Sequence, residues 1–513
     1  MPAASLSVHN GEPHVELPRL RARRVGLLTH DEAVVVMRTD CLVARAEGLA
    51  PRSQVLLCAG GREVYATLFQ IEGDVIGADE AALSEMAWTL LGVAEGDLIQ
   101  VRHPPSLESL AGVRRRIYGQ RLDQAALNAV VADVVAGRYM DVHLAAFLTA
   151  CSTLPLDDEE TVYLTQAMTA AGDTLTWPSE IVVDKHCVGG LPGNRTTPIV
   201  VAIVTALGLV MPKTSSRAIT SPAGTADTME TLAPVDLDLA AMRRVVEAEG
   251  GCIAWGGSMR LSPADDIFIR VERVLDVDTE GQLIASVLSK KIAAGVNRLV
   301  LDIPVGPTAK VRSDEAARNL AMRMESVGAR FGLHVHCMLT DGAQPVGRGI
   351  GPALEAKEVL AVLQQHPGAP ADLRRRACLL AGEVLEMSGV AEKGQGAAAA
   401  HAVLADGRAW AKFERICEAQ GGMRQPPNSS LQRVLRATRS GRVVHLNNRK
   451  IARLAKLAGA PAVKAAGVVM HVRLGEEVAA GRPMVTVHAD TAGELDYALD
   501  YAAANPDIIE IEA

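Results

Sequence analysis

Residues 181–194 read IVVDKHCVGGLPGN, and this stretch decides the fold of the chain. A strand-like apolar run at 181–183 leads into a charged, glycine-rich turn, and a helical run follows the turn. Thr197 suits the cap of that helix, Pro198 its first position and Gly208 its end. A strand, a tight turn and a helix in this order are typical of an α/β protein.

The turn from Lys185 to Asn194 has the composition of an anion-binding site. Glycines let backbone N–H groups approach a ligand closely, and a helix N-terminus adds unpaired donors. Lys185 supplies a full positive charge. Taken alone, such a turn is equally compatible with a tight connection. Its spacing matches neither GxxxxGK[ST] nor GxGxxG, which disfavours a nucleoside triphosphatase or a dehydrogenase and leaves a small phosphate-bearing ligand or free phosphate.

Composition excludes several classes of protein. The 513 residues are 49% hydrophobic, which suffices for three or more domains with cores, and the net charge of -8 argues against nucleic-acid binding. The longest apolar run, 198–211, is too short to span a membrane, and the N-terminus has no signal core. Eight scattered cysteines predict reduced thiols in a cytoplasmic protein. His334 and His336 fit an alternating strand better than a zinc site, so we expect no metal.

Four regions follow one another along the chain. Residues 1–104 contain short strands at 33–37, 55–58, 64–71 and 97–102 and a helical run at 81–91, which predicts a small β-barrel domain. Residues 105–175 predict a helical domain. Residues 176–345 alternate strands with helices and predict an α/β domain, whereas 346–513 predict three helices and then β structure from Leu431, an α+β domain. The expected fold class is thus multidomain α/β and α+β.

Within the α/β domain, strands are expected at 181–183, 209–211, 252–255, 299–303 and 333–339. Ser313 should cap a helix that runs from Asp314 to Phe331 and stops at Gly332. The glycine-rich 346–351 stretch lacks the context of a cofactor turn and is interpreted as a hinge or linker.

A second charged turn, KTSSRAITSPAGT, covers residues 213–225. It is dense in hydroxyl groups and backbone donors, and it contains two cations. Loops at the carboxyl ends of adjacent parallel strands converge on one crevice. We therefore expect one anion to be surrounded by Lys185, Gly189, Gly190, Ser216 and Thr225. Thr225 should also cap a helix over 226–232.

A third element begins at Asp278, near the start of a helix on which Ser286 and Lys290 share one face. One interpretation is a capping aspartate with a solvated serine and lysine. Another is chemistry at the anomeric carbon of a nucleoside, where anionic phosphate attacks and the departing base needs a donor. Cationic loops would hold the nucleophile, and an acid near the base would add about 10²–10⁴-fold in rate.

Four motifs together resemble those of the thymidine phosphorylase family: KHCVGG at 185–190, SRAITS at 216–221 within the second turn, PAD at 263–265 and ASVLSKK at 285–291. The resemblance covers nearly the whole chain and is strongest to the long branch, which includes archaeal AMP phosphorylases and bacterial thymidine phosphorylases. That branch has an N-terminal barrel-like domain, a helical domain, an α/β domain and a C-terminal α+β domain.

The resemblance implies a pentosyltransferase that converts thymidine and phosphate to thymine and 2-deoxyribose 1-phosphate. An alternative is phosphorolysis of a nucleoside monophosphate such as AMP, which gives a free base and ribose 1,5-bisphosphate. A further alternative is a catalytically silent nucleotide-binding protein. The family implies inorganic phosphate as co-substrate, no other cofactor, and a homo-oligomer, at least a dimer.

Residue roles follow from the same resemblance. It implies that Asp278 is the proton donor and that Ser286 and Lys310 contact the substrate. Lys185 and Lys290 match lysines used for phosphate and base. The residues implied to line the phosphate and nucleotide site are Gly190, Ser216, Arg217, Ala218, Ile219, Thr220, Ser221 and Thr225. Cys187 stands where many members have a phosphate-binding serine, and Arg270 and Arg273 are only near the place of an arginine that holds the pyrimidine.

Overall fold

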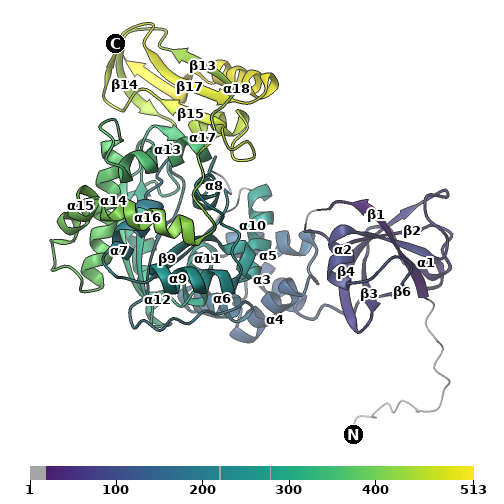
Figure 1. Ribbon diagram of the computed structural model, residues 1–513. Coiled ribbons are helices and arrows are strands. Elements are labelled where there is room, and N and C mark those ends of the chain that lie inside the picture. The colour runs from purple at the N-terminus through teal and green to yellow at the C-terminus, as the bar shows by residue number, and fades with distance from the viewer. Residues whose placement is uncertain (1–18, 30, 219–220, 276, 278, 513) are drawn as a thin grey trace. The chain divides into compact units, whose positions relative to one another are not determined.

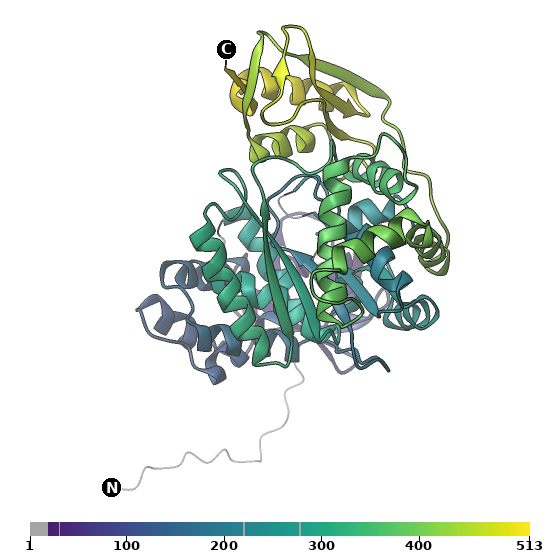
Figure 2. The ribbon, with the colours of Figure 1, turned by 90° about the vertical axis from the view of Figure 1, so that its left-hand side faces the viewer.

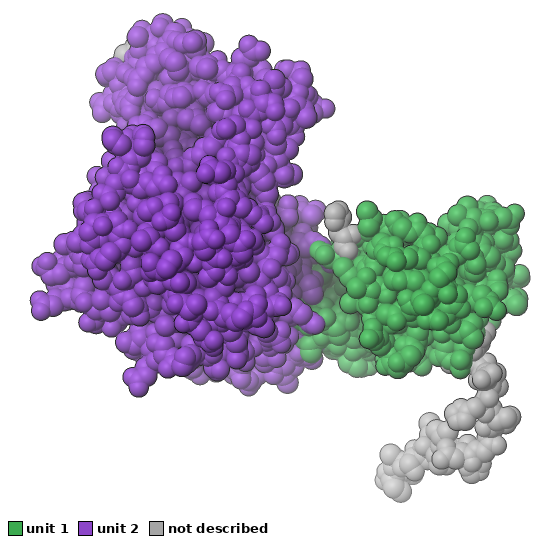
Figure 3. All heavy atoms as spheres, in the orientation of Figure 1, with its two compact units in different colours: residues 1–111, 132–144 green, residues 112–131, 145–513 purple. Residues whose placement is uncertain are grey.

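The computed structural model describes residues 19–512 except 30, 219, 220, 276 and 278. The chain divides into two compact units, which are shown in different colours in Figure 3. One comprises Met1–Ala111 with Ala132–Leu144, and the other comprises Gly112–Val131 with Ala145–Ala513. No helix among the described residues is long and apolar enough to cross a membrane.

The first unit contains a closed six-stranded barrel (Figure 1), which confirms the predicted β-barrel. Its strands, in the order of their pairing, are β1 (Arg19–Leu27), β5 (Glu80–Ser84), β2 (Val34–Arg38), β4 (Arg62–Ile71), β3 (Gln54–Ala59) and β6 (Leu98–Arg102), with short helices α1 (Leu42–Ala46) and α2 (Glu85–Leu91). The prediction of a helix from residue 81 was wrong for residues 81–84, which belong to β5. Residues 80–84 pair with β1 and β2, and the Ser84 hydroxyl then caps α2 by accepting from Ala87 N.

The predicted helical region is confirmed by α3 (Leu110–Ile117), α4 (Gln124–Val135), α5 (Asp141–Thr153) and α6 (Asp158–Ala170). A buried ion pair fastens part of it, because Arg116 Nη1 lies 2.7 Å from Glu160 Oε1. Arg116 also donates to Leu154 O, and Glu160 accepts from Leu122 N. Glu160 further completes a capping box with Asp157 at the start of α6.

The second unit contains a parallel sheet of five strands, as the alternation of strands and helices predicted. The strands are β7 (Val183–Cys187), β8 (Met211–Ser215), β9 (Gly251–Trp255), β10 (Arg298–Val305) and β11 (His334–Asp341). One ladder has the order β11-β10-β7 and a second pairs β8 with β9, while a parallel bridge between Val182 and Val210 joins the two. The carboxyl ends of all five strands therefore lie at one edge of the sheet.

Side chains alternate between the two faces of this sheet, and each face has its own core. Val183 and Val300 pack with the apolar helix α7 (Thr197–Ala206) and with helices that follow residue 345. Val182, Leu299 and Leu301 pack with α11 (Glu280–Ala293) and α12 (Asp314–Ala329). Figure 2 shows the strands between these two groups of helices. The remaining helices of this region are α8 (Thr225–Glu230), α9 (Leu239–Glu249), η1 (Gly256–Met259) and α10 (Pro263–Leu275).

Two predicted strands and two predicted helix caps were wrong in their bounds. The strands expected at 181–183 and 209–211 begin later and extend to Cys187 and Ser215, because pairing with β10 and β9 continues through the charged residues. Lys185 is thus a strand residue rather than a turn residue. Thr196, not Thr197, is the N-cap position of α7, and Gly224, not Thr225, is that of α8. The predicted Ser313 cap of α12 is confirmed, since its hydroxyl accepts from Ala316 N.

Between residues 345 and 431 there are four helices instead of the expected three: α13 (Pro352–Leu363), α14 (Ala371–Met387), α15 (Gly396–Ala405) and α16 (Arg408–Ala419). The C-terminal α+β part has two sheets, with the orders β12-β15-β17-β13 and β16-β14-β18. Its elements are β12 (Gly349–Ile350), β13 (Leu431–Arg436), β14 (Gly441–Leu446), α17 (Asn448–Leu457), β15 (Gly467–Met470), β16 (Glu477–Val478), β17 (Pro483–Ala489), α18 (Ala492–Ala504), η2 (Pro506–Ile508) and β18 (Ile509–Glu512).

Candidate active site

Gly190, in the loop after β7, packs directly against Lys310, in the loop after β10. A Cβ atom on Gly190 would lie 2.5 Å from Lys310 N and 2.6 Å from Lys310 Cβ, and its φ of +79° is left-handed. Only glycine fits this contact without movement of the backbone. Gly189 also has a left-handed φ, +90°, but a Cβ there would meet nothing within 4 Å. The structure thus brings Gly190 and Lys310 together and leaves open space beside Gly189.

Cys187 acts as an acceptor inside this loop. Its Sγ lies 3.3 Å from Asn194 Nδ2 and 3.5 Å from Gly189 N. Burial, together with the nearby Asp302 carboxylate, raises the pKa of the Cys187 thiol to about 12, so the thiol stays protonated at neutral pH. All eight cysteines of the chain are free. Cys187 therefore helps to shape the loop, at the position where the family resemblance led us to expect a serine.

Lys185 lies beneath the same loop rather than in the open. Its Nζ donates to Thr196 Oγ1 at 2.7 Å and lies 4.0 Å from Asp302 Oδ2. Its side chain is only 1% exposed. The positive charge expected for an anion site is present. Because the side chain is buried, this charge acts on a ligand through its electrostatic field and not by direct contact.

Asp184, the neighbour of Lys185 on β7, holds a buried pair of lysines. Its carboxylate lies 3.1 Å from Lys213 Nζ and 2.7 Å from Lys291 Nζ. Burial opposes the ionised carboxylate, but the two ammonium groups outweigh burial and lower the pKa of Asp184. Burial also lowers the pKa of Lys213, more than Asp184 restores it. Sequence reasoning missed this cluster, although an aspartate inside an apolar strand and the KK pair at 290–291 were its signals.

His186 faces the same cations. Burial lowers its pKa well below the usual range, and four lysine ammonium groups add to the effect. These groups belong to Lys185, Lys213, Lys290 and Lys291. The imidazole is therefore neutral at neutral pH.

The loop after β8 is closed by Asp227, whose Oδ2 accepts from Ala218 N at 2.6 Å and from Gly224 N at 2.9 Å. Arg217 is held by Glu230 through two hydrogen bonds of 2.8 and 2.9 Å, and its guanidinium lies 4.7 Å from the centre of the Trp255 ring. Arg217 thus shapes the loop.

Other predicted residues of this loop have simpler surroundings. The Ser221 hydroxyl donates to Ala223 O at 2.9 Å, and Ser216 is partly buried with its carbonyl accepting from Ala226 N. Ile219 and Thr220 lie outside the described residues.

Ser286 and Lys290 lie on α11 as predicted, and both are partly buried. Lys290 forms an ion pair with Asp265 of α10. Burial opposes the protonated ammonium, but Asp265 and Asp266 outweigh burial and raise the pKa of Lys290. Thr279 caps α11 by accepting from Gln282 N.

The predicted proton donor Asp278, directly before Thr279 in sequence, lies outside the described residues. Arg270, on α10, is partly buried, and Arg273 on the same helix is exposed.

Direct contacts join the separate motifs into one site. Asp184 links β7 to Lys213 of β8 and to Lys291 of α11, and Arg195 links the loop after β7 to Thr225. Gly190 meets Lys310. The site thus has cations beneath it and backbone donors at its edge, an arrangement suited to a phosphate group.

Comparison with known proteins agrees with this geometry. Residues 179–410 match the model "Glycosyl transferase family, a/b domain", and 113–172 match "Glycosyl transferase family, helical bundle domain". Residues 442–508 match "Pyrimidine nucleoside phosphorylase C-terminal domain". A protein of Chelativorans sp. named "Putative thymidine phosphorylase" is 69% identical over 97% of this chain and 98% of its own length. One of the same name from Tolumonas auensis is 63% identical, with the same coverage.

This chain belongs to the thymidine phosphorylase family. The predicted family is confirmed, and the chain is a pentosyltransferase. Among solved structures, anthranilate phosphoribosyltransferase from Thermus thermophilus is similar, with a TM-score of 0.49 and 23% identity over 60% of this chain and 99% of that chain. Of the motifs that resemble this family, KHCVGG forms the end of β7 and the start of the loop after it, and ASVLSKK lies within α11.

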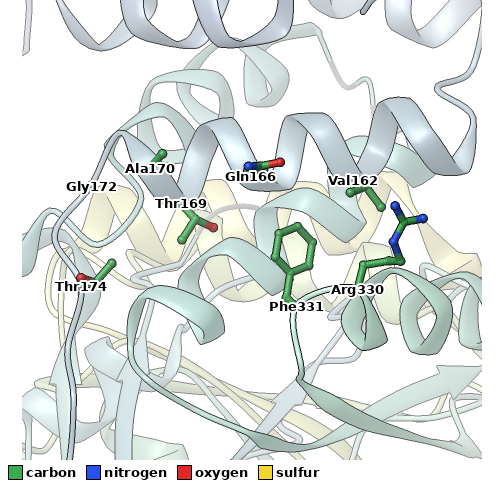
Figure 4. Close-up of a pocket in the computed structure, with 8 residues that line it drawn as sticks. All are labelled: Val162, Gln166, Thr169, Ala170, Gly172, Thr174, Arg330 and Phe331. Carbon is green, nitrogen blue, oxygen red and sulfur yellow. The ribbon is translucent and has the colours of Figure 1, made fainter. Parts of the chain in front are cut away.

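A separate cavity of 570 Å³ lies away from these loops (Figure 4). It is lined by Val162, Gln166, Thr169, Ala170, Gly172, Thr174, Arg330 and Phe331. Thr174 precedes β7 and Phe331 precedes β11, so the cavity lies toward the amino ends of the strands. None of the predicted site residues that the structure describes lines it.

Proposed function

We propose that this enzyme catalyses the phosphorolysis of thymidine to thymine and 2-deoxyribose 1-phosphate. The observation that supports the proposal best is the gathering of cations and backbone donors around the loops after β7, β8 and β10. The names of the relatives and of the matched C-terminal domain point to the same substrate class. The proposal includes inorganic phosphate as co-substrate and no other cofactor, and a homo-oligomer in the cytoplasm.

In the proposed reaction, a phosphate oxygen forms a bond to C1′ of the sugar while the bond from C1′ to the base nitrogen breaks. The electron pair of the broken bond goes to the base, and the proton that neutralises it comes from Asp278. The backbone at Gly189 and Gly190 and the Thr225 hydroxyl hold the phosphate. The proposal assigns the positive charge that favours the anionic nucleophile to the lysines near these loops, among them Lys185 and Lys290.

We propose that side chains of α11 bind the base. Ser286 and Lys290 lie on one face of this helix, and the ion pair with Asp265 holds the Lys290 ammonium in one orientation. Lys310 contacts the sugar or phosphate from the loop that packs on Gly190. Hydrogen-bond donors on α11 suit the carbonyl oxygens of a pyrimidine base.

A substrate panel tests the proposal. Purified protein is incubated with thymidine, uridine, AMP, CMP or UMP, with and without inorganic phosphate, and free base is measured. We expect phosphate-dependent release of thymine, and a Ser286→Ala variant should raise the thymidine KM more than the phosphate KM. Release of base from AMP but not from thymidine would contradict the proposal and would show that the enzyme acts on nucleoside monophosphates. No base from any of the five would indicate a nucleotide-binding protein without catalysis.

A further inference from the structure

We propose that Arg195 is a positioning residue that makes the Thr225 hydroxyl a hydrogen-bond donor to phosphate; this inference rests on the proposed function. Arg195 follows the glycine-rich loop and precedes α7. It has no counterpart among the residues that the family resemblance pointed to, and it reaches Thr225 across 30 positions of the sequence.

Each nitrogen of the Arg195 guanidinium has a partner. Nε donates to Glu355 Oε2 at 2.6 Å, Nη1 to Thr225 Oγ1 at 2.7 Å and Nη2 to Ala223 O at 2.8 Å. Because the guanidinium is planar and its donors are fixed relative to one another, three partners in two segments, residues 223–225 and helix α13, define its orientation. The side chain is 12% exposed, so water competes little for these bonds.

Glu355 holds the Nε end of the Arg195 guanidinium. It belongs to the first turn of α13 and is 2% exposed. Its Oε1 accepts from Gly351 N at 3.2 Å, and its Oε2 also accepts from Thr228 Oγ1 at 3.4 Å. When ionised, the Glu355 carboxylate balances the charge of Arg195 and holds the guanidinium away from the ligand. Burial raises the pKa of Glu355 to about 7, so the carboxylate is mostly ionised only above neutral pH. Arg195 therefore acts on the site through Thr225 and not by direct contact.

The direction of the hydrogen bond from Arg195 decides whether the Thr225 hydroxyl can donate to a ligand. A guanidinium has donors and no acceptor, so the Thr225 oxygen must accept from Nη1 and the hydroxyl proton must point elsewhere. Thr225 is partly exposed, and no acceptor for its hydroxyl proton is found among the residues that the structure describes. The positive charge at 2.7 Å also makes the hydroxyl a stronger donor. An anionic phosphate oxygen is the acceptor that this hydroxyl fits.

Thr196 provides an internal comparison. Its Oγ1 accepts from Lys185 Nζ at 2.7 Å, which is the same kind of contact between a cation and a threonine. Thr196 is fully buried, however, so no ligand reaches its hydroxyl. Of these two pairs, only Arg195 with Thr225 combines a fixed cation with a hydroxyl at the surface of the site.

Steady-state kinetics of four variants test the inference. Thr225→Val and Arg195→Met should each raise the phosphate KM about tenfold, the value of one hydrogen bond to a charged group, with little change in kcat or in the thymidine KM. Arg195→Lys should recover part of the loss, because an ammonium still donates to Thr225. The double variant Arg195→Met with Thr225→Val should be no worse than either single variant, since both remove the same donor.

The alternative is a purely structural clamp, and it gives a different pattern. Arg195→Met would then raise both KM values, and its effect would add to that of Thr225→Val. Either result would overturn the inference. Because Arg195→Met leaves Glu355 unpaired, the variant Arg195→Met with Glu355→Gln removes both charges and should show the same rise in phosphate KM.

Calorimetric titration with inorganic phosphate separates this inference from the proposed function. If wild-type protein releases no base but binds phosphate, the proposed function fails while the inference is still tested. Thr225→Val and Arg195→Met must then weaken phosphate binding about tenfold. Phosphate binding that is equal in wild type and both variants would refute the inference whether or not the protein is active.

Discussion

Replacement of Asp184 by asparagine tests the buried charge cluster beneath the site. The Asp184 carboxylate is fully buried between the ammonium groups of Lys213 and Lys291, at 3.1 and 2.7 Å. Asparagine keeps the size and one oxygen acceptor but removes the negative charge. Two buried ammonium groups would then lie close together without a counter-charge, and the folded state would lose free energy relative to the unfolded state.

The magnitude follows from the burial of all three side chains, which are 3% exposed or less. Removal of one partner from a buried ion pair costs about 3–5 kcal/mol. The pKa of Lys213 is already lowered by burial, so this lysine can lose its proton when Asp184 is absent and limit the loss. We therefore expect the free energy of unfolding at pH 7 to fall by about 3 kcal/mol, the lower end of that range.

Urea unfolding, followed by tryptophan fluorescence and circular dichroism, measures this change. Asp314→Asn is the matched control, because its carboxylate pairs with Arg318 at 3.6 Å and both side chains are 68% exposed. The control should lose no more than about 1 kcal/mol. The double variant Asp184→Asn with Lys291→Met should be more stable than the sum of the single effects predicts, since it removes one of the unpaired charges. A loss for Asp184→Asn no larger than for the control, or strict additivity with Lys291→Met, would refute the reasoning.

Three further predictions concern Gly190, Asp278 and Glu355. Gly190→Ala should raise the phosphate KM tenfold or more, about the value of one lost hydrogen bond to an anion, because its Cβ would lie 2.5 Å from Lys310 N. Gly189→Ala is the control, since it has the same backbone strain without the collision. Equal effects of the two substitutions would contradict this account. Asp278→Asn should lower kcat about 10²-fold or more and leave phosphate binding intact, as expected for loss of a general acid; an unchanged kcat would exclude that role. Burial raises the pKa of Glu355 from 4.5 to about 7, so between these pH values the folded protein binds more protons than the unfolded chain, and stability should fall as pH rises through this window. Glu355→Gln should reduce the difference between urea midpoints at pH 5 and pH 7.5, and a difference as large as in wild type would show that another group is responsible.

Local patterns were enough to predict much of the fold. Alternation of apolar strands and amphipathic helices predicted a sheet covered by helices, and the Ser313 cap and the N-terminal barrel are confirmed. Strand ends were predicted less well, because charged residues such as Lys185 and Lys213 look like turn residues when only their neighbours in sequence are considered. Pairing with β10 and β9 keeps them in the sheet, and pairing across strands is not encoded in local composition.

The sequence by itself determined which groups are available for chemistry: two loops rich in glycine and hydroxyl groups, a serine and a lysine on one face of a helix, and the motifs of a family. Tertiary structure alone decided how those groups are used. It paired Asp184 with two lysines, placed Gly190 against Lys310 and directed Arg195 to Thr225, 30 residues away. The reason is physical: whether a charge is a ligand, a counter-ion or a means of orienting a hydroxyl depends on its burial and its partners, and both come from contacts between segments distant in sequence.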